Sequence, residues 1–407
     1  MKVLLIVLAF TVPAEAQQFT YRGFAQIQST AYPQTTPQDN DRFGAEALLR
    51  FEPAYKPIDW LTLAGSVDAR MDTFEQVERT WRFDARDRGL QRPSLSLRHA
   101  TATLRKSTFT IDVGKQFVRW GKADILNPTD RFAPRDFVEV TDDEFLAVTG
   151  ARGRYERGPH SIDVVWVPIF TPSRTPLIGR RWAPLPPQTF GTTGFVDLDP
   201  QFPDRGQYGA RWNVLGPGFE LSVSYFDGFN HLPQYTATPL SSRPIIALQR
   251  TYAPLRMGGG DAAVPLRWFT VKGEVASLIT SSRNADNVIL YVVQLERQSG
   301  ELSLVAGYAG EIVTERRFTF DFAPDRGLTR AFLGRAGYTI DATSDVSFEA
   351  AVRQNLDGVW IKGQYSEAIG AHWRATIAGA AIGGNERDFI GQYRRNSHVL
   401  MTMRFSF

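Results

Sequence analysis

Charged side chains of both signs crowd one stretch of the sequence, GKQFVRWGKADILNPTDRFAPRD, which runs from Gly114 to Asp136. The stretch follows a strand-like segment and is interrupted by Pro128 and Pro134, so we predict a loop. Its charges can contact a charged solute, or they can pair with one another and fix the shape of the loop. The candidate residues are Arg119, Trp120, Lys122, Asp124, Asp130, Arg131, Arg135 and Asp136.

Four carboxylates follow at Glu139, Asp142, Asp143 and Glu144, and oxygen ligands of this kind bind divalent cations. Thr141 and Glu144 also have the spacing of a helix capping box, and a solvated loop face is the simpler interpretation. The chain has no cysteine, and its five histidines lack the spacing of metal ligands. Phosphate-binding loops, nucleophile elbows and zinc motifs are absent from the sequence. We therefore predict neither an enzyme nor a bound metal or cofactor.

Alternation with a period of two dominates the chain from Phe19 onward. Segments such as 43–51, 219–225 and 399–407 place apolar residues at every second position, which is the pattern of strands with one apolar face. The connections between such segments alternate in length. The long ones are 30–41, 71–93, 119–145, 169–206, 229–244 and 312–328, and the short ones include 105–107, 157–159, 215–218, 297–300 and 342–345.

Long external loops and short periplasmic turns are typical of outer-membrane β-barrels, which in bacteria have an even number of strands. We count about 18 strands, with 16 as the alternative because the pattern is poor near 245–257. In lipid every backbone polar group must be paired internally, so the strand near 19–29 must pair with that near 397–407. The sequence predicts an all-β fold, a transmembrane antiparallel up-and-down β-barrel.

The N-terminal segment predicts export from the cytoplasm. Lys2 precedes an apolar run at 3–12, and the small residues Ala14 and Ala16 then form a cleavage site. The run is too short to span a bilayer as a helix. We predict a cleaved signal peptide at 1–16, a barrel at 17–407, and location in the outer membrane of a Gram-negative cell. The net charge of +3 is too small to indicate a nucleic-acid partner.

The last strand ends in Phe407, behind an alternating apolar face. A terminal aromatic residue in this position resembles the signature that outer-membrane proteins present to the barrel-assembly machinery. The expected partners are therefore this machinery, outer-membrane lipid and lipopolysaccharide, and a small polar solute. The sequence leaves open whether the barrels associate as a homotrimer.

Charges on the polar face of the predicted strands fall into two arcs of the wall. If apolar residues face lipid, these charges face the lumen and can set solute selectivity. The alternative is that they keep the lumen wet and bridge neighbouring strands. The basic arc contains Arg22, Arg50, Arg335, Arg353, Lys362, Arg374 and Arg404, and the acidic arc contains Asp68, Asp112, Glu220, Glu274 and Glu301.

Two clusters of motifs carry a family resemblance. They are GKQ at 114–116, RWGKxD at 119–124 and NPxD at 127–130, followed by WVPxFxPxR at 166–174. These motifs resemble the hallmark of an uncharacterised porin-like family of Gram-negative outer-membrane proteins. The match covers residues 114–174, and the remainder resembles the family in pattern alone. The resemblance implies a fold and a location, and it implies no substrate.

The sequence as a whole favours a porin-like channel for passive diffusion of small polar or anionic solutes. In general porins the third external loop folds inward, so we expect 119–145 to narrow the pore. Three alternatives remain open: an export barrel for an acidic polysaccharide, a transporter of apolar small molecules, and an outer-membrane enzyme.

Overall fold

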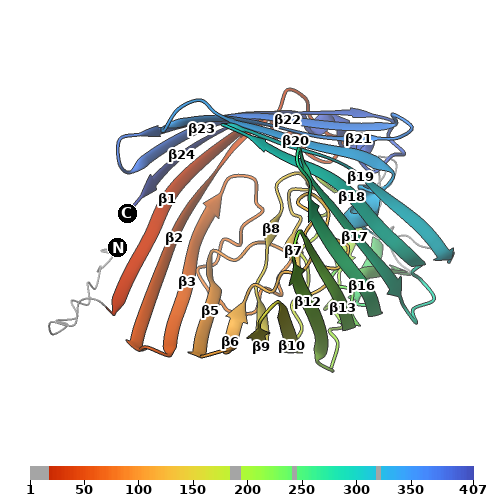
Figure 1. Cartoon of the computed structure of the whole chain (residues 1–407). Helices are drawn as coiled ribbons and strands as arrows, with labels where there is room; N and C mark the ends of the chain where they lie inside the picture. Colours follow the sequence, from red (N-terminus) through yellow and green to blue (C-terminus); the bar gives the residue numbers. More distant parts are fainter. Residues whose placement is uncertain (1–17, 184–193, 241–244, 318–321) are drawn as a thin grey trace.

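Eighteen long antiparallel strands form a closed barrel (Figure 1). The computed structural model describes residues 18–183, 194–240, 245–317 and 322–407, so the predicted signal peptide at 1–16 lies outside the described residues. The barrel strands are β1 (Phe19–Ala31), β2 (Phe43–Ile58), β3 (Leu61–Asp72), β5 (Leu95–Lys106), β6 (Phe109–Gln116), β9 (Val148–Arg157), β10 (His160–Ile169), β12 (Gln207–Gly216), β13 (Phe219–Phe229), β16 (Pro254–Pro265), β17 (Thr270–Ile279), β18 (Asn287–Ser299), β19 (Leu302–Glu315), β20 (Ala331–Thr339), β21 (Ser344–Arg353), β22 (Gly358–Ile369), β23 (Trp373–Gly384) and β24 (His398–Ser406).

The first and last strands close the sheet. β1 pairs with β24 in antiparallel register, with Ile27 opposite Met403 and Ala31 opposite Val399. The backbones of Gly23 and Phe407 exchange two hydrogen bonds of 2.9 and 3.0 Å at the end of this seam. The predicted count of 18 strands and the predicted pairing of the chain ends are both confirmed.

The predicted connections also agree with the structure. The short turns predicted at 105–107, 157–159, 215–218, 297–300 and 342–345 all lie at one end of the barrel, between consecutive strands. Most of the connections at the other end are long and carry the short elements β4 (Phe83–Asp84), β7 (Arg135–Asp136), β8 (Glu144–Phe145), β11 (Gly194–Asp197), α1 (Pro324–Gly327) and the 3-10 helix η2 (Gly391–Asn396).

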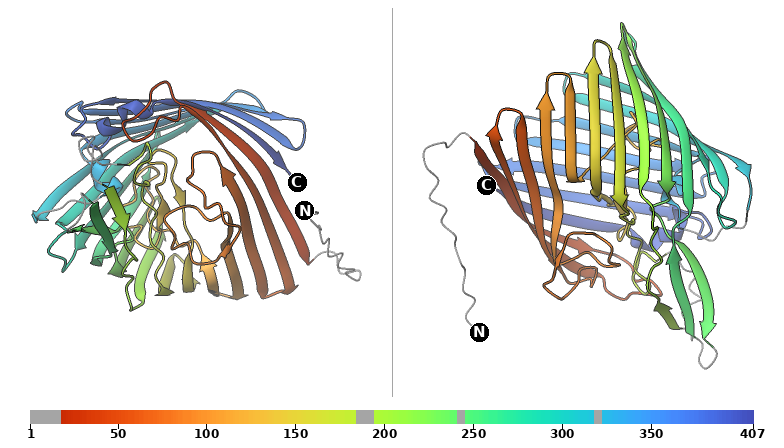
Figure 2. Two further views of the ribbon diagram at one scale, coloured as in Figure 1. Left: turned by 180° about the vertical axis from the view of Figure 1, so that it is seen from behind. Right: turned by 90° about the horizontal axis from the view of Figure 1, so that it is seen from below.

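The weakly patterned region at 245–257 contains two strands that belong to different sheets. β14 (Gln234–Leu240) and β15 (Ile245–Thr251) form a hairpin that extends beyond the barrel rim (Figure 2), and β11 adds to β15 as a parallel strand. The barrel strand β16 starts only three residues after β15, at Pro254. The alternative count of 16 strands is therefore wrong.

The exterior of the barrel is apolar, and its interior contains charged side chains together with clusters of buried apolar ones. Tyr21, Ile27 and Met401 point outward and are each 61 % exposed, whereas Asp68 and Arg70 point inward and are buried. A water-soluble sheet protein places these two classes the other way round, so the outer face is suited to lipid. In the part of the chain that the structure describes, none of the helices has the length and apolar character needed to cross a membrane.

Cross-linking can test the β1–β24 seam directly, because the native chain has no cysteine. Ile27 and Met403 are direct partners, and opposed Cβ atoms in adjacent strands lie close to disulfide range. We expect Ile27→Cys/Met403→Cys to form a cross-link on oxidation, seen as altered electrophoretic mobility of the unfolded protein. Ile27→Cys/Ile377→Cys is the control, because Ile377 lies one strand further away; equal cross-linking of both variants would contradict the register.

Candidate functional site in the barrel lumen

The connection between β6 and β9, residues 117–147, folds into the barrel, and we call it the constriction loop. Figure 1 shows its short strands β7 and β8 within the ring of barrel strands. Trp120 and Phe132 are almost completely buried, and the edge of one ring meets the face of the other at 5.1 Å. Phe132 packs in turn on Phe226 of the wall strand β13. The aromatic side chains therefore fix the first half of the loop against the wall.

A single carboxylate of the wall holds the loop backbone. Glu274 of β17 accepts hydrogen bonds from the backbone amides of Lys122 at 3.1 Å, Ala123 at 3.3 Å and Thr129 at 2.8 Å, and from the Thr129 hydroxyl at 2.8 Å. Gly121 allows this approach, because it has a φ of +92° and a Cβ atom there would lie 2.7 Å from the carboxylate. Glu274 is buried, and its four hydrogen bonds anchor the loop to β17.

The charged side chains at the start of the constriction loop form ion pairs with the barrel wall. Lys122 forms ion pairs with Glu220 and with Asp261, the latter at 3.3 Å. Asp124 pairs with Lys272 of β17 at 3.0 Å. These contacts satisfy both loop charges on the wall formed by β13, β16 and β17.

A turn within the loop is closed by its own ion pair. Asp130 accepts hydrogen bonds from the Arg119 side chain at 2.8 Å and from the backbone amide of Trp120 at 3.0 Å. Burial raises the pKa of Asp130, and these two donors oppose that rise. The indole N–H of Trp120 also donates to Asp163 of β10 at 3.1 Å.

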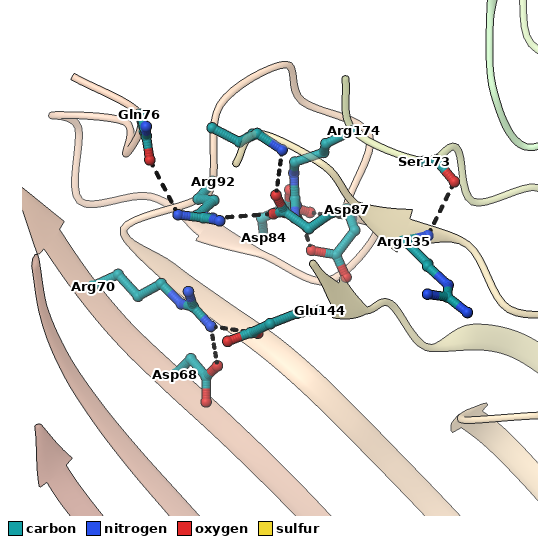
Figure 3. Close-up of polar contacts among 12 residues, drawn as sticks. Asp68, Arg70, Gln76, Asp84, Asp87, Arg92, Arg135, Glu144, Ser173 and Arg174 are labelled. Carbon is teal, nitrogen blue, oxygen red and sulfur yellow. Dashed lines mark hydrogen bonds and ion pairs between the residues drawn. The ribbon is translucent and has the colours of Figure 1, made fainter. Parts of the chain in front are cut away.

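The second half of the loop joins a network of buried charges (Figure 3). Asp136 accepts from Arg92 at 3.2 Å and from Arg174 at 2.9 Å. Arg174 also binds Asp87, which pairs with Lys115 of β6. Burial alone would raise the pKa of Asp136, but the positive charges of Arg92 and Arg174 outweigh it and hold that pKa below its usual range.

The loop returns to β9 along the opposite side of the lumen. Glu144 accepts from Arg70 of β3 at 2.8 Å and from Arg98 of β5 at 3.0 Å, as Figure 3 shows for Arg70. Arg70 also contacts Asp68 at 3.4 Å. The constriction loop is thus fixed to β3 and β5 at one end and to β10, β13, β16 and β17 at the other.

A cavity of about 410 Å³, which we call the passage, lies between the constriction loop and the remaining arc of the wall at β20–β23. On the loop side, the guanidinium groups of Arg119 and Arg135 lie over the Phe145 ring, at 3.6 and 4.3 Å from its centroid. On the wall side, Arg335 and Glu349 form an ion pair of 2.8 Å whose side chains are 43 % and 34 % exposed.

Most of the predicted wall charges have partners across neighbouring strands or in nearby connections. Six of the seven residues predicted for the basic arc have a side-chain partner, and the seventh, Lys362, has an acidic residue opposite it in the sheet. Arg22 binds Glu52, Arg50 binds Asp68, Arg335 binds Glu349, Arg353 binds Asp388, Arg374 binds Asp345, Arg404 binds Gln26, and Lys362 lies opposite Glu349 in the sheet register.

Most residues of the predicted acidic arc are also paired with other groups of the protein. Asp112 pairs with Arg154 at 3.0 Å, and Glu220 and Glu274 bind the constriction loop. Glu301 lies in the turn between β18 and β19, because β19 begins one residue later, so its prediction as a wall residue is wrong. Acids and bases therefore alternate around much of the wall.

Among the other predicted loop residues, Arg131 pairs with Asp325 at 3.0 Å and Arg135 with Asp143 at 2.8 Å. Sequence reasoning missed Asp87 and Arg92, which lie in the long connection 71–93, and Asp163, which lies on strand β10. Lys115 and Arg174, however, lie at the two ends of the motif region 114–174, and their contact through Asp87 explains why these distant motifs belong together.

Comparisons with known proteins agree on the fold. No protein-family model matches the chain, and no curated protein matches it. Among solved structures, OccAB4 of Acinetobacter baumannii is 10 % identical with a TM-score of 0.56, over 97 % of this chain and 99 % of that one. OpdQ of Pseudomonas aeruginosa is 8 % identical with a TM-score of 0.52, over 96 % and 98 %. The chain therefore has the fold of these barrels.

Replacement of Glu274 tests how the loop is anchored. Glu274→Gln removes the charge that accepts four hydrogen bonds, and each bond to a charged group is worth roughly 1.5–3 kcal/mol. We expect hydrogen exchange at the amides of Lys122, Ala123 and Thr129 to accelerate roughly 10–100-fold. Glu301→Gln is the control, with the same charge change in a distant turn; unchanged exchange in Glu274→Gln would contradict the anchor.

Glu139 should make the loop sensitive to pH. Burial raises the pKa of Glu139 from 4.5 to about 7, and the charge of Arg92 only partly offsets this. The docked segment 137–144 therefore binds a proton more tightly than the released segment, and its docking weakens as pH rises from about 4.5 to 7. We expect its hydrogen-exchange protection, corrected for intrinsic rates, to be about tenfold or more lower at pH 8 than at pH 5. Glu139→Gln should abolish the difference, and a persistent difference in that variant would assign it to another group.

Proposed function

We propose that the protein is an outer-membrane channel through which small polar solutes, anions among them, diffuse passively. The observation that carries this proposal is the docking of the constriction loop across the lumen, from β3 and β5 to β13–β17, which leaves a cavity of about 410 Å³ along β20–β23. An apolar exterior and a polar, loop-narrowed interior are typical of porin barrels. Barrels of 16–18 strands also have lumens wide enough for an aqueous channel.

The passage supports a small solute better than the alternatives. A polysaccharide export barrel needs an open lumen along its length, whereas ion pairs fix this loop across the lumen. A transporter of apolar molecules needs a lateral exit, whereas every adjacent pair of barrel strands is hydrogen-bonded in the described residues. An enzyme needs a converging catalytic group, and the passage charges instead form ion pairs.

The environment of the barrel follows from the same proposal. Outer-membrane lipid and lipopolysaccharide would surround the apolar belt that includes Tyr21 and Met401. Phe407 remains exposed at the turn end of the seam, where the barrel-assembly machinery would bind it. A homotrimer would bury part of the same belt.

Ion selectivity would depend on few groups. The two predicted arcs of opposite charge are largely neutralised by local pairs, so a field across the whole lumen is weaker than the sequence suggests. Arg335 and Glu349 differ from most of these pairs because they line the passage and remain partly exposed. We therefore place selectivity at this pair.

Planar bilayers test the channel and its selectivity together. We expect the refolded protein to give stepwise KCl conductance. Arg335→Gln should shift the reversal potential toward cations and Glu349→Gln toward anions, each changing the permeability ratio roughly twofold. Arg374→Gln is the control, since its ion pair lies outside the passage. A folded but silent protein would contradict the channel, and unchanged reversal potentials would contradict only the role of the pair.

A further inference from the structure

A second hollow lies beside the passage, at the loop end of β18, β19 and β20. Its volume is about 430 Å³, which is within the range of small-molecule sites. Five arginines line it: Arg316, Arg317, Arg326, Arg330 and Arg353. The acidic residues of the lining are Asp286 and Glu311, and two further carboxylates, Glu315 and Asp388, pair with lining arginines, so five positive charges stand against four negative ones.

Three of these arginines are held in place by the protein. Arg326 binds Asp286 at 3.0 Å and also Glu311. Arg353 binds Asp388 at 2.9 Å and donates to the carbonyl of Gly327 at 2.9 Å. Such contacts fix a guanidinium group before a ligand arrives, which lowers the entropic cost of binding.

Arg317 is held in the same way. It pairs with Glu315 at 2.8 Å and donates to the carbonyl of Thr280 at 3.0 Å. Its partners come from the end of β19 and from the connection after β17, so its position is set by two segments of the rim.

The other two arginines have no carboxylate partner within the described residues. Arg316 and Arg330 are both exposed at the rim. Arg330 has a φ of +52°, which is unfavourable for a residue with a side chain. Its carbonyl accepts a hydrogen bond of 2.8 Å from the amide of Gln354, which helps to hold this conformation. Arg316 and Arg330 thus add two positive charges that no carboxylate of the described residues pairs with, and such charges gain most from a multivalent anion.

The hollow opens toward the lumen. Glu311 and Val313 of β19 lie opposite Leu290 and Val288 of β18, and those two partners are buried inside the barrel. A ligand that enters from the lumen is a soluble molecule.

The hollow also adjoins the passage. Asp325 and Leu328 line the passage, whereas Arg326 and Thr329 line the hollow, so one short segment separates the two spaces.

We propose that this hollow is a capture site for small soluble anions with two or more adjacent negative groups, such as phosphoanhydrides or polycarboxylates. Guanidinium groups bind the oxygens of such anions in pairs, and several of them together discriminate against monovalent anions. Binding requires only the folded barrel. The further step, in which captured anions are delivered to the passage, rests on the proposed channel function.

Inorganic pyrophosphate is a suitable probe. We expect it to bind the refolded full-length barrel in calorimetry, and Arg316→Ala/Arg330→Ala to weaken binding about tenfold or more. Arg105→Ala/Arg157→Ala is the matched control, because it removes two arginines at the turn end of the barrel. Arg316→Lys/Arg330→Lys keeps the charge without the paired donors and should bind with intermediate affinity.

Each outcome bears on one proposal. Failure of wild-type protein to bind pyrophosphate, or equal weakening in both double-alanine variants, would overturn the capture site. In wild-type protein, pyrophosphate added on one side of a bilayer should reduce KCl current more than the same concentration of chloride. This second measurement remains informative if a variant does not refold. Normal KCl conductance with no pyrophosphate effect would support the channel and reject the capture site. Arginine-dependent pyrophosphate binding by a barrel that conducts no KCl would support the capture site and reject the channel.

Discussion

Hydrocarbon offers a peptide group no hydrogen-bond partner, and the arrangement of this molecule follows from that constraint. The sheet has to close on itself, which brings Gln26 and Arg404 into contact although they are 378 residues apart in the chain. Closure also decides which face of every strand points inward. Polar side chains on that face have no access to bulk solvent on the lipid side, so they find partners across the lumen or bind the loops that enter it.

Lumenal charges serve two purposes in this barrel. Where an acid and a base meet in a dry position, as at Asp136 and Arg174, they fix a loop, and removing one partner would leave a buried charge uncompensated. Where guanidinium groups meet without enough acids, as at Arg316 and Arg330, they leave an attractive field for dissolved anions. The sequence contains nearly equal numbers of acids and bases, and only their placement separates these roles.

The strand number and the closure could be predicted because period-two alternation and connection lengths report directly on a barrel, whereas the inward loop was expected from the behaviour of the third external loop in general porins. The same signals failed near 245–257, where only Tyr252 and Ala253 separate two strands of different sheets. Alternation also tells which face a residue occupies without telling which residue lies across from it. Glu274 was therefore expected to face the solute, whereas it binds loop amides, and a one-residue shift in a strand boundary placed Glu301 in the wall.

The cluster around Asp136 constrains the order of assembly. Lys115 belongs to β6, Asp87 and Arg92 to the connection after β3, and Arg174 to the connection after β10, so the cluster cannot form until all three segments have been brought together. A nascent sheet that has not yet folded these connections inward would hold a wide, water-filled interior. The narrow bore therefore depends on these three connections being folded inward, and a barrel without that arrangement would have a wider interior.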